Sequence, residues 1–386
     1  MKRVLVAISS RANYGSIQST MRAIKSHSNL SLSVLLYASG MVNRYGNLQE
    51  QMTKDGLSPD YLINTKLDGD SVRTMAESTG IALLQIPTVI ESLKPDFVIT
   101  VGDRYETIAT AIAASYMNIP LVHTMGGEVT GTIDESVRHA ISKLSHIHFT
   151  ATQRARENLV RMGEEPSLVF MTGCPRLDLA KEAKGLALPT LQLKALESGV
   201  GDEIDFSKDF LILSQHPVTS EASDASSQIY KSLQAVEKFN MQTIVLWPNA
   251  DAGSEKISKT IRSWGNESER RRVRFYRNLP PEIYLKLMDL TVCMVGNSSS
   301  AIREGSFLGT PAVNVGSRQS GREHASNVNF VGNSVKDIEI AMRNQITHGK
   351  YKSEHIYGDG FAGIRMADEL ATLDRVNTQK QLKFIW

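Results

Sequence analysis

The stretch that decides the fold is residues 101–139, VGDRYETIATAIAASYMNIPLVHTMGGEVTGTIDESVRH. One apolar run, residues 97–101, ends just before a Gly-Asp-Arg sequence, and a second, residues 119–122, ends just before His123. Apolar residues recur at helical spacing between the two runs, so the pattern predicts strand, helix, strand. Because open α/β sheets bind ligands beyond the carboxyl ends of their strands, we expect functional side chains here.

The same alternation of strand-like runs and amphipathic segments continues on both sides of this stretch. Strands are expected at residues 4–8, 32–38, 97–101, 119–122, 146–151 and 169–172, and then at 210–214, 243–247, 273–276, 290–295 and 312–315. Helices are expected at residues 16–26, 71–93, 108–117, 133–145 and 154–162, and then at 226–240, 254–264, 281–288, 301–307, 335–346 and 361–373. Such alternation predicts parallel sheets with helices on both faces.

A shift in composition divides the chain. Residues 181–208 mix charges, glycines and a proline with weak periodicity, and we interpret them as the bridge between two domains. The predicted fold class is α/β, with two doubly wound Rossmann-like domains and a central cleft, the B-type glycosyltransferase (GT-B-like) architecture. The first domain is expected at residues 1–180 and the second, nucleotide-binding one at 181–360, with a C-terminal helix over residues 361–386 packing back on the first.

Charge and hydropathy exclude two kinds of partner. The net charge of +2 comes from 43 basic and 41 acidic residues, which is too even a balance for a nucleic-acid-binding surface. No apolar run reaches the ~18 residues of a membrane span, and the first apolar run is too short for the core of a signal peptide. We expect neither a nucleic-acid nor a membrane partner.

The cysteine count and the short motifs argue against bound groups. Cys174 and Cys293 are too few for a disulfide framework or a cysteine zinc site, and a reduced cytoplasm is the expected location. The chain contains neither a GxxxxGK[ST] loop nor a GxGxxG fingerprint. No cluster of cysteine, histidine or carboxylate side chains has the sequence spacing of metal ligands. We therefore expect neither a metal nor a cofactor.

Two polar loops in the second half have the composition of a phosphate site. The turn VGNSSS at residues 295–300 precedes a predicted helix, whose free N–H groups attract anions, although the same turn also suits an ordinary serine-capped helix. The loop GSRQSGR at residues 316–322 adds two guanidinium groups, which bind diphosphates bidentately. The candidate binding residues are Asn297, Ser298, Ser299, Arg318, Gln319 and Arg322.

Further candidates follow other predicted strands. His216 lies between a strand and a proline, and is either a turn residue or an acid, base or phosphate partner. Asn249 and Asp251, in PNADAG, either bind a ligand or only form the turn. Arg11 follows the first strand of the chain, where it is a candidate for the same phosphate group.

Three carboxylates, those of Asp103, Glu128 and Asp134, stand close together in the sequence. Moving a proton on or off carbon requires such a group in a closed site. Asp134 and Arg138 also have the spacing of a simple helix ion pair, and His139 beside them is either functional or a core histidine. The candidate set of this stretch is Asp103, Arg104, Glu128, Asp134, Arg138 and His139.

Together these motifs resemble those of the UDP-N-acetylglucosamine 2-epimerases, in particular the hydrolysing branch of sialic- and legionaminic-acid biosynthesis. The most specific piece is GGEVTGTIDESVRHAISKLSH at 126–146. The resemblance extends over about residues 3–331 and includes SSRANY at 9–14, VGDRYET at 101–107, TGCPRLD at 172–178, QHPVT at 215–219, PNADAGS at 248–254, GNSSSAIRE at 296–304 and GTPAVNVGSRQSGRE at 309–323.

The resemblance implies a reaction in two steps. UDP leaves the sugar by anti elimination to give a 2-acetamidoglycal, and water then adds to give the free 2-epimer, N-acetylmannosamine in the parent case. The implied catalytic residues are Asp103, Glu128, Asp134 and His216. The implied ligand contacts are Arg11, Ser298, Ser299, Arg318 and Arg322 to the diphosphate, and Asn249 and Glu304 to the sugar or ribose. A homo-oligomer, dimer or tetramer, is also implied.

The chain departs from the family pattern at two positions. Asn13 stands where members often carry aspartate, and Met125 stands where they often carry histidine, glutamate or glutamine. Because Met125 is close to the expected sugar pocket, the resemblance leaves two substrates open, UDP-N-acetylglucosamine and a UDP-2,4-diacetamido-2,4,6-trideoxy-hexose. Three alternatives stay open: a non-hydrolysing 2-epimerase, a GT-B glycosyltransferase and a nucleotide-sugar sensor without turnover.

Overall fold

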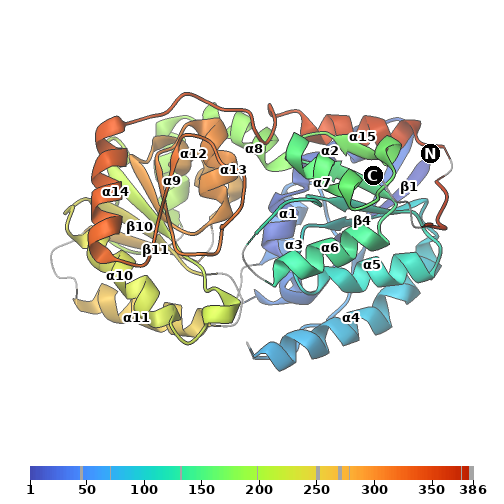
Figure 1. Cartoon of the computed structure of the whole chain (residues 1–386), viewed down its shortest axis with the longest axis horizontal. Coiled ribbons are helices and arrows are strands. Elements are labelled where there is room, and N and C mark those ends of the chain that lie inside the picture. The colour runs from blue at the N-terminus through green and yellow to red at the C-terminus, as the bar shows by residue number, and fades with distance from the viewer. Residues whose placement is uncertain are drawn as a thin grey trace. The chain divides into compact units, whose positions relative to one another are not determined.

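The computed structural model describes residues 1–43, 47–69, 71–130, 133–197, 199–248, 253–267, 272–277, 279–374 and 376–381. The chain forms two compact units, each built on its own seven-stranded sheet (Figure 1). The first unit comprises Met1–Val129, Ile133–Asp178 and Tyr357–Trp386, and the second comprises Thr130–Thr132 and Leu179–Ile356. The predicted fold class, α/β with two doubly wound Rossmann-like sheets, is confirmed.

The first unit contains strands and helices in regular alternation. They are β1 (Lys2–Ile8), α1 (Arg11–Gly15), α2 (Gln18–Ser26), β2 (Leu30–Leu36), η1 (Ala38–Met41), α3 (Leu48–Lys54), β3 (Tyr61–Leu62), α4 (Val72–Leu93), β4 (Phe97–Val101), α5 (Thr107–Tyr116), β5 (Leu121–Thr124), α6 (Asp134–Leu144), β6 (Ile147–Thr150), α7 (Gln153–Arg161), η3 (Pro166–Leu168), β7 (Val169–Met171), the start of α8 (Pro175–Lys184) and α15 (Ala362–Thr372). The strand order is β3-β2-β1-β4-β5-β6-β7. All pairs are parallel, and the order reverses between β1 and β4.

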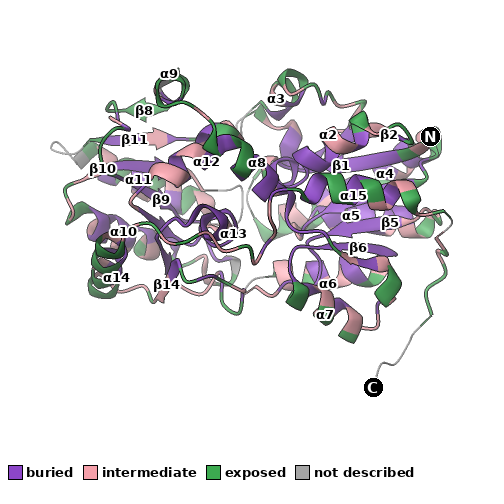
Figure 2. Ribbon diagram, turned by 90° about the horizontal axis from the view of Figure 1, so that it is seen from above, coloured by how far each residue is buried: buried purple, intermediate pink, exposed green. Residues whose placement is uncertain are grey.

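The central strands β1, β4, β5 and β6 of this sheet are largely buried on both faces, because helices cover both. Val4, Val6 and Ile8 of β1 pack in one core with residues of α2 and α15. Leu5 and Ala7, which point to the opposite face, pack in a second core with residues of α4, α5 and α6. Figure 2 accordingly shows β1 and β6 as buried. Burial on both faces explains why these strands appear in the sequence as continuous apolar runs.

The C-terminal helix α15 packs beside α2 and is held at both ends (Figure 1). The Asp178 carboxylate accepts the backbone N–H groups of Ala362 and Gly363, at 2.9 and 2.7 Å. At the other end, the Lys2 ammonium donates to the Ala371 carbonyl at 2.8 Å. Both charges complement the helix dipole.

The helix α15 agrees with the helix expected over residues 361–373, but it is shorter than the range 361–386 given for the C-terminal helix in the domain prediction. It ends at Thr372, and Leu373 already has extended backbone angles. Residues 376–381 are not helical, and 382–386 lie outside the described residues. Lys2 binds the Leu370 and Ala371 carbonyl oxygens at this end of the helix.

The second unit repeats this architecture. Its elements are the end of α8, α9 (Leu188–Glu197), β8 (Val200–Gly201), β9 (Phe210–Ser214), η4 (Thr219–Glu221), α10 (Ala225–Glu237), β10 (Gln242–Leu246), α11 (Ser254–Glu267), β11 (Val273–Tyr276), α12 (Pro281–Leu290), β12 (Cys293–Gly296), α13 (Ser299–Leu308), β13 (Ala312–Val315), β14 (Val328–Val331) and α14 (Val335–His348). The strand order is β14-β13-β12-β9-β10-β11-β8, with the reversal between β9 and β12. Only the edge strand β8 is antiparallel among the described pairs.

Three local expectations were wrong. The helix expected over residues 16–26 is present as α2, which begins at Gln18, but the short helix α1 before it, Arg11–Gly15 with Ser10 as N-cap, was not predicted. The weakly periodic bridge contains α9, which buries Leu191 and Ala195. The strand β14 was not predicted, because its residues are mostly half-buried and form no long apolar run. Across the part of the chain that the structure describes, no helix combines the length and apolar character of a membrane span.

Candidate active site

In the first unit, the loops after β1 and β4 meet at the point where the strand order reverses. Asn13 in α1 is buried, and its side-chain Nδ2 donates to the Val101 carbonyl oxygen at 2.9 Å. Ser10 caps the same helix by accepting the Asn13 N–H at 3.2 Å. An aspartate in place of Asn13 has no donor for that carbonyl. Asn13 therefore ties the first loop of the site to the strand that precedes Asp103.

The centre of the candidate site is Arg138, which is fully buried. Its Nε lies 3.1 Å from Asp103 Oδ2, and its Nη2 binds the same oxygen. Its Nη1 lies 2.8 Å from the Glu128 carbonyl oxygen and 2.8 Å from Glu135 Oε2. One guanidinium group thus holds together the turn after β4, the turn after β5 and the first turn of α6.

The electrostatics of this cluster are those of a permanent buried cation. Burial lowers the pKa of Arg138, but the carboxylates of Asp103, Glu128 and Glu135 outweigh burial and raise that pKa above its ordinary value. The Asp103 side chain is 26% exposed, whereas Glu128 is buried. The site therefore holds one carboxylate that solvent or a substrate can reach and a second one in the interior.

The first turn of α6 supplies further polar groups. Glu135 Oε1 lies 2.8 Å from His139 Nε2, so Glu135 bridges Arg138 and His139 along one face of the helix. Asp134, the first residue of α6, is half-buried. The sequence pattern did not single out Glu135, although its spacing of three and four residues from its partners was a readable signal.

Two other arginines of this unit are partly buried. Arg104 Nε lies 2.9 Å from Glu106 Oε1, and the Glu106 side chain is 1% exposed. Glu106 is thus a second partner residue that the sequence pattern missed. Arg11 is the first residue of α1, and burial lowers its pKa to about 10. At neutral pH Arg11 therefore keeps the charge that an anion site requires.

In the second unit, His216 and Asn297 join the loops after β9 and β12. The His216 N–H donates to Asn297 Oδ1 at 2.7 Å, and Asn297 Nδ2 donates to the His216 carbonyl oxygen at 2.9 Å. Gly296 precedes Asn297 with φ of +125°, and a β-carbon there would lie 2.1 Å from the Ser214 carbonyl oxygen. Only glycine permits this close approach of the two strand ends.

The helix α13 begins in this turn. Ser298 is its N-cap and Ser299 its first residue. Ser300 Oγ lies 2.7 Å from Ser298 Oγ and 2.5 Å from the hydroxyl of Tyr284. Glu304 is fully buried on the same helix. The N-terminus of α13 thus presents serine hydroxyls and the positive end of the helix dipole, as a phosphate site requires.

The loop after β13 packs on the same turn. Arg318 Nη1 and Gln319 Nε2 both donate to the Asn297 carbonyl oxygen, at 3.2 and 3.0 Å. Arg322, at the end of the loop, is buried, and its backbone N–H donates to the Gln319 carbonyl at 3.2 Å. The Ser317 hydroxyl donates to Glu221 at 2.6 Å, which fixes the start of the loop. The two loops of the predicted phosphate site are therefore neighbours.

Two candidates are not placed. Asn249 and Asp251 lie outside the described residues. Within the described ranges, no three His, Cys, Asp or Glu side chains are grouped so that they could hold a metal ion.

The two doubly wound sheets, each with polar side chains where its strand order reverses, define the GT-B-like class of two-domain α/β protein. A family model described as UDP-N-acetylglucosamine 2-epimerase matches residues 22–371, and the chain belongs to this family.

Relatives support this assignment. The chain is 34% identical to a Legionella pneumophila UDP-N,N'-diacetylbacillosamine 2-epimerase (hydrolyzing), over 97% of this chain and 96% of the relative. It is 29% identical to a Neisseria meningitidis UDP-N-acetylglucosamine 2-epimerase, over 100% and 99%. The fold is similar to a crystal structure of the UDP-GlcNAc 2-epimerase from Neisseria meningitidis bound to UDP-GlcNAc, with a TM-score of 0.81, 18% identity and coverage of 95% of this chain and 99% of that one.

Proposed function

We propose that the protein is a hydrolysing nucleotide-sugar 2-epimerase, which releases UDP and the free 2-epimer of its sugar. The observation that carries the proposal is the buried Arg138, which binds the Asp103 carboxylate and the Glu128 carbonyl oxygen. It keeps two carboxyl-bearing turns in a fixed arrangement, which acid–base work on carbon requires. The relative at 34% identity, named as hydrolyzing, supports the hydrolytic outcome.

The proposed chemistry has two balanced steps. A base removes the C2 proton, the C2–H electron pair becomes the C1–C2 double bond, and the C1–O pair leaves with UDP. Water then adds its oxygen to C1, while an acid returns a proton to C2 on the opposite face. Asp103, Glu128 and Asp134 supply the carboxyl groups for these proton transfers.

The second unit supplies the anion-binding groups in this proposal. Arg318 and Arg322 bind the diphosphate, and the N-terminus of α13, with Ser298 and Ser299, binds a phosphate oxygen. His216 stabilises the departing diphosphate, and Asn297 holds its backbone in place. Transition-state charge develops on the leaving diphosphate, so fixed donors are more effective there than mobile ones.

The proposed sugar is a 2,4-diacetamido-2,4,6-trideoxy-hexose in preference to N-acetylglucosamine. Met125 is 8% exposed and has φ of +64°, a left-handed conformation that costs a side-chain-bearing residue about 1 kcal/mol. Its methyl group lies against Gly102, where a β-carbon would come within 3.2 Å of it. A thioether held beside Asp103 favours a sugar whose C6 is a methyl group. The name of the Legionella relative supports the same choice.

The test is proton NMR in deuterated water with each UDP-sugar in turn. Release of UDP and a free 2-epimer deuterated at C2 supports the proposal. A UDP-linked epimer would assign a non-hydrolysing reaction. Release of UDP only when an acceptor sugar is added would point to a glycosyltransferase, and tight binding without any product would point to a sensor. A higher kcat/KM for UDP-N-acetylglucosamine would overturn the choice of sugar alone.

The cytoplasmic location and the dimeric or tetrameric state stay predictions from the sequence. Light scattering of the purified protein measures the second directly, and a monomer would contradict it. Fractionation of cells measures the first.

A further inference from the structure

We propose that His123, together with Ser142, is a positioning residue. The pair fixes the position of the turn that carries Asp103 relative to the turn that carries Glu128. The inference rests on the proposed function, because it assigns those two carboxyl groups to proton transfer. The His123 side chain belongs to β5 and is fully buried, so it does not touch the substrate itself.

The hydrogen bonds of His123 specify one tautomer. Its Nε2 lies 2.9 Å from the carbonyl oxygen of Gly102, and its Nδ1 lies 3.1 Å from the hydroxyl of Ser142. A carbonyl oxygen only accepts, so Nε2 carries the proton. Nδ1 is then the acceptor, and the Ser142 hydroxyl donates to it. His123 therefore holds the peptide group directly before Asp103.

The turn that carries Glu128 packs on the same pair of side chains. A β-carbon on Gly126 would lie 2.8 Å from His123 Nδ1 and 2.9 Å from Ser142 Oγ. Any side chain there would displace the pair, so Gly126 is required by close approach. His123 and Ser142 thus contact the Asp103 turn on one side and the Glu128 turn on the other.

Helix α6 connects this pair to Arg138. Ser142 lies four residues after Arg138, which places both side chains on one face of the helix. Arg138 binds the Asp103 side chain, and Ser142 acts on the Gly102 carbonyl through His123. Helix α6 therefore holds the Gly102–Asp103 turn through two side chains, directly through Arg138 and indirectly through Ser142. A rotation or translation of the helix would move both together.

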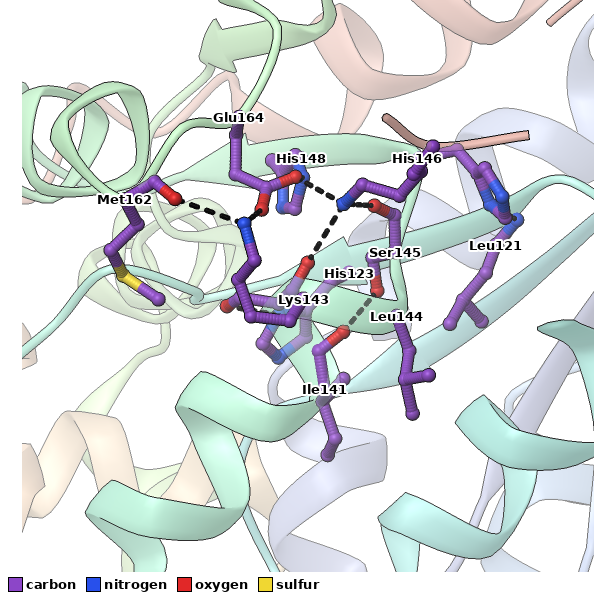
Figure 3. Close-up of polar contacts among 12 residues, drawn as sticks. Leu121, His123, Ile141, Lys143, Leu144, Ser145, His146, His148, Met162 and Glu164 are labelled. Atoms are coloured by element: carbon purple, nitrogen blue, oxygen red, sulfur yellow. Dashed lines mark hydrogen bonds and ion pairs between the residues drawn. The ribbon is translucent and has the colours of Figure 1, made fainter. Parts of the chain in front are cut away.

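His123 stays neutral in this setting. Burial, with smaller contributions from His148 and Arg138, lowers the pKa of His123 to about 3, although the Gly102 carbonyl and Asp103 act in the opposite direction. His148 is its registered neighbour on β6 (Figure 3 draws both histidines). A group that is uncharged throughout the neutral range does not exchange protons with a substrate, so its contribution is geometric.

The kinetic test compares three variants. His123→Phe keeps the ring volume but removes both hydrogen bonds, and we expect kcat to fall about 10- to 100-fold, the effect of a small misplacement of reacting groups. His123→Gln offers an amide N–H and a carbonyl oxygen, and it should recover part of that loss. Ser142→Ala should lower kcat while the affinity for UDP stays within about twofold.

The matched control is His148→Gln. His148 is equally buried on the neighbouring strand and binds Glu164 at 3.0 Å. It should lower thermal stability with little change in kcat. If the His123 and His148 variants lost kcat equally, His123 would have only a structural role, and the inference would be overturned.

A second readout needs no turnover. Nitrogen-15 NMR of the imidazole groups in the wild-type protein should show a His123 with protonated Nε2 and bare Nδ1 across the neutral pH range. A protonated Nδ1 would overturn the inference even if the enzyme is active. If wild-type protein turns over neither UDP-sugar, the proposed function fails, while the tautomer result still tests the geometry.

Discussion

The Arg138 guanidinium binds the Asp103 carboxylate through two nitrogens, Nε at 3.1 Å and Nη2, that converge on Oδ2. Arg138 is 1% exposed and Asp103 is 26% exposed. The pair joins the turn after β4 to helix α6, and its two residues are far apart in the sequence. A buried guanidinium in this position stabilises the site mainly because its removal would leave carboxylates without compensation.

The first prediction concerns the loss of stability when the carboxylates lose the positive charge of Arg138. Arg138→Met should lower the free energy of unfolding by about 3 kcal/mol, at the low end for buried pairs, because both carboxylate partners are 26% exposed. Urea denaturation measures the change. The control is Arg73→Met, where an 84% exposed arginine pairs with Glu77 on α4, and the expected change is within about 0.5 kcal/mol. Equal effects would contradict the central role of Arg138.

The second prediction separates chemistry from binding. Glu128→Gln keeps the size and the backbone carbonyl that Arg138 binds, but it removes the acid–base group. Turnover should fall by about 10²- to 10⁴-fold, with UDP affinity by calorimetry unchanged. Full activity would remove Glu128 from the mechanism, and a parallel loss of UDP binding would assign it a different role.

The third prediction concerns the diphosphate. Arg322→Ala removes a buried guanidinium from the loop after β13, and the loss of a charge-assisted contact of about 1.5–3 kcal/mol predicts roughly 10- to 100-fold weaker UDP binding. Arg343→Ala, on the exposed face of α14 and 59% exposed, should leave the affinity unchanged. An unaltered calorimetric affinity in both variants would place Arg322 outside the site.

The fourth prediction is a pH dependence of stability. Glu164 is 1% exposed and binds Lys143 at 2.7 Å, His148 at 3.0 Å and Lys380 (Figure 3 shows the first two). Burial raises its pKa, but these partners outweigh burial and lower it from 4.5 to about 2. The contribution is thus present above pH 4.5 and lost as pH falls toward 2; it is worth about 3 kcal/mol.

Its measurement is the free energy of unfolding across that pH window. Glu164→Gln should be less stable than wild type at neutral pH, and the difference should shrink as the pH falls from 4.5 toward 2. The exposed Glu157 of α7 offers a control, since Glu157→Gln should leave the pH dependence unchanged. A constant difference between wild type and Glu164→Gln at all pH values would rule out the assigned linkage.

Much of the fold was predictable because it depends on local pattern. Strands β9, β11 and β13 have the predicted bounds, since a parallel strand covered on both faces must be a continuous apolar run. The half-exposed β14 lacks that pattern and was missed. His123 was expected just after a strand, but the structure places it within β5. Pairing with β4 and β6 extends that strand beyond its apolar residues.

The sequence by itself determined which side chains follow the strands, among them Asp103, Glu128, His216 and Asn297. In a parallel sheet all strands run in the same direction, so the residues that follow each strand lie at the same edge of the sheet. Only the tertiary structure decided which of them meet. The contacts of Arg138 with Asp103, of His123 with Gly102 and Ser142, and of Asn297 with His216 cross from one strand or helix to another. Such contacts depend on the register of the sheet and the packing of α6, which no local periodicity encodes.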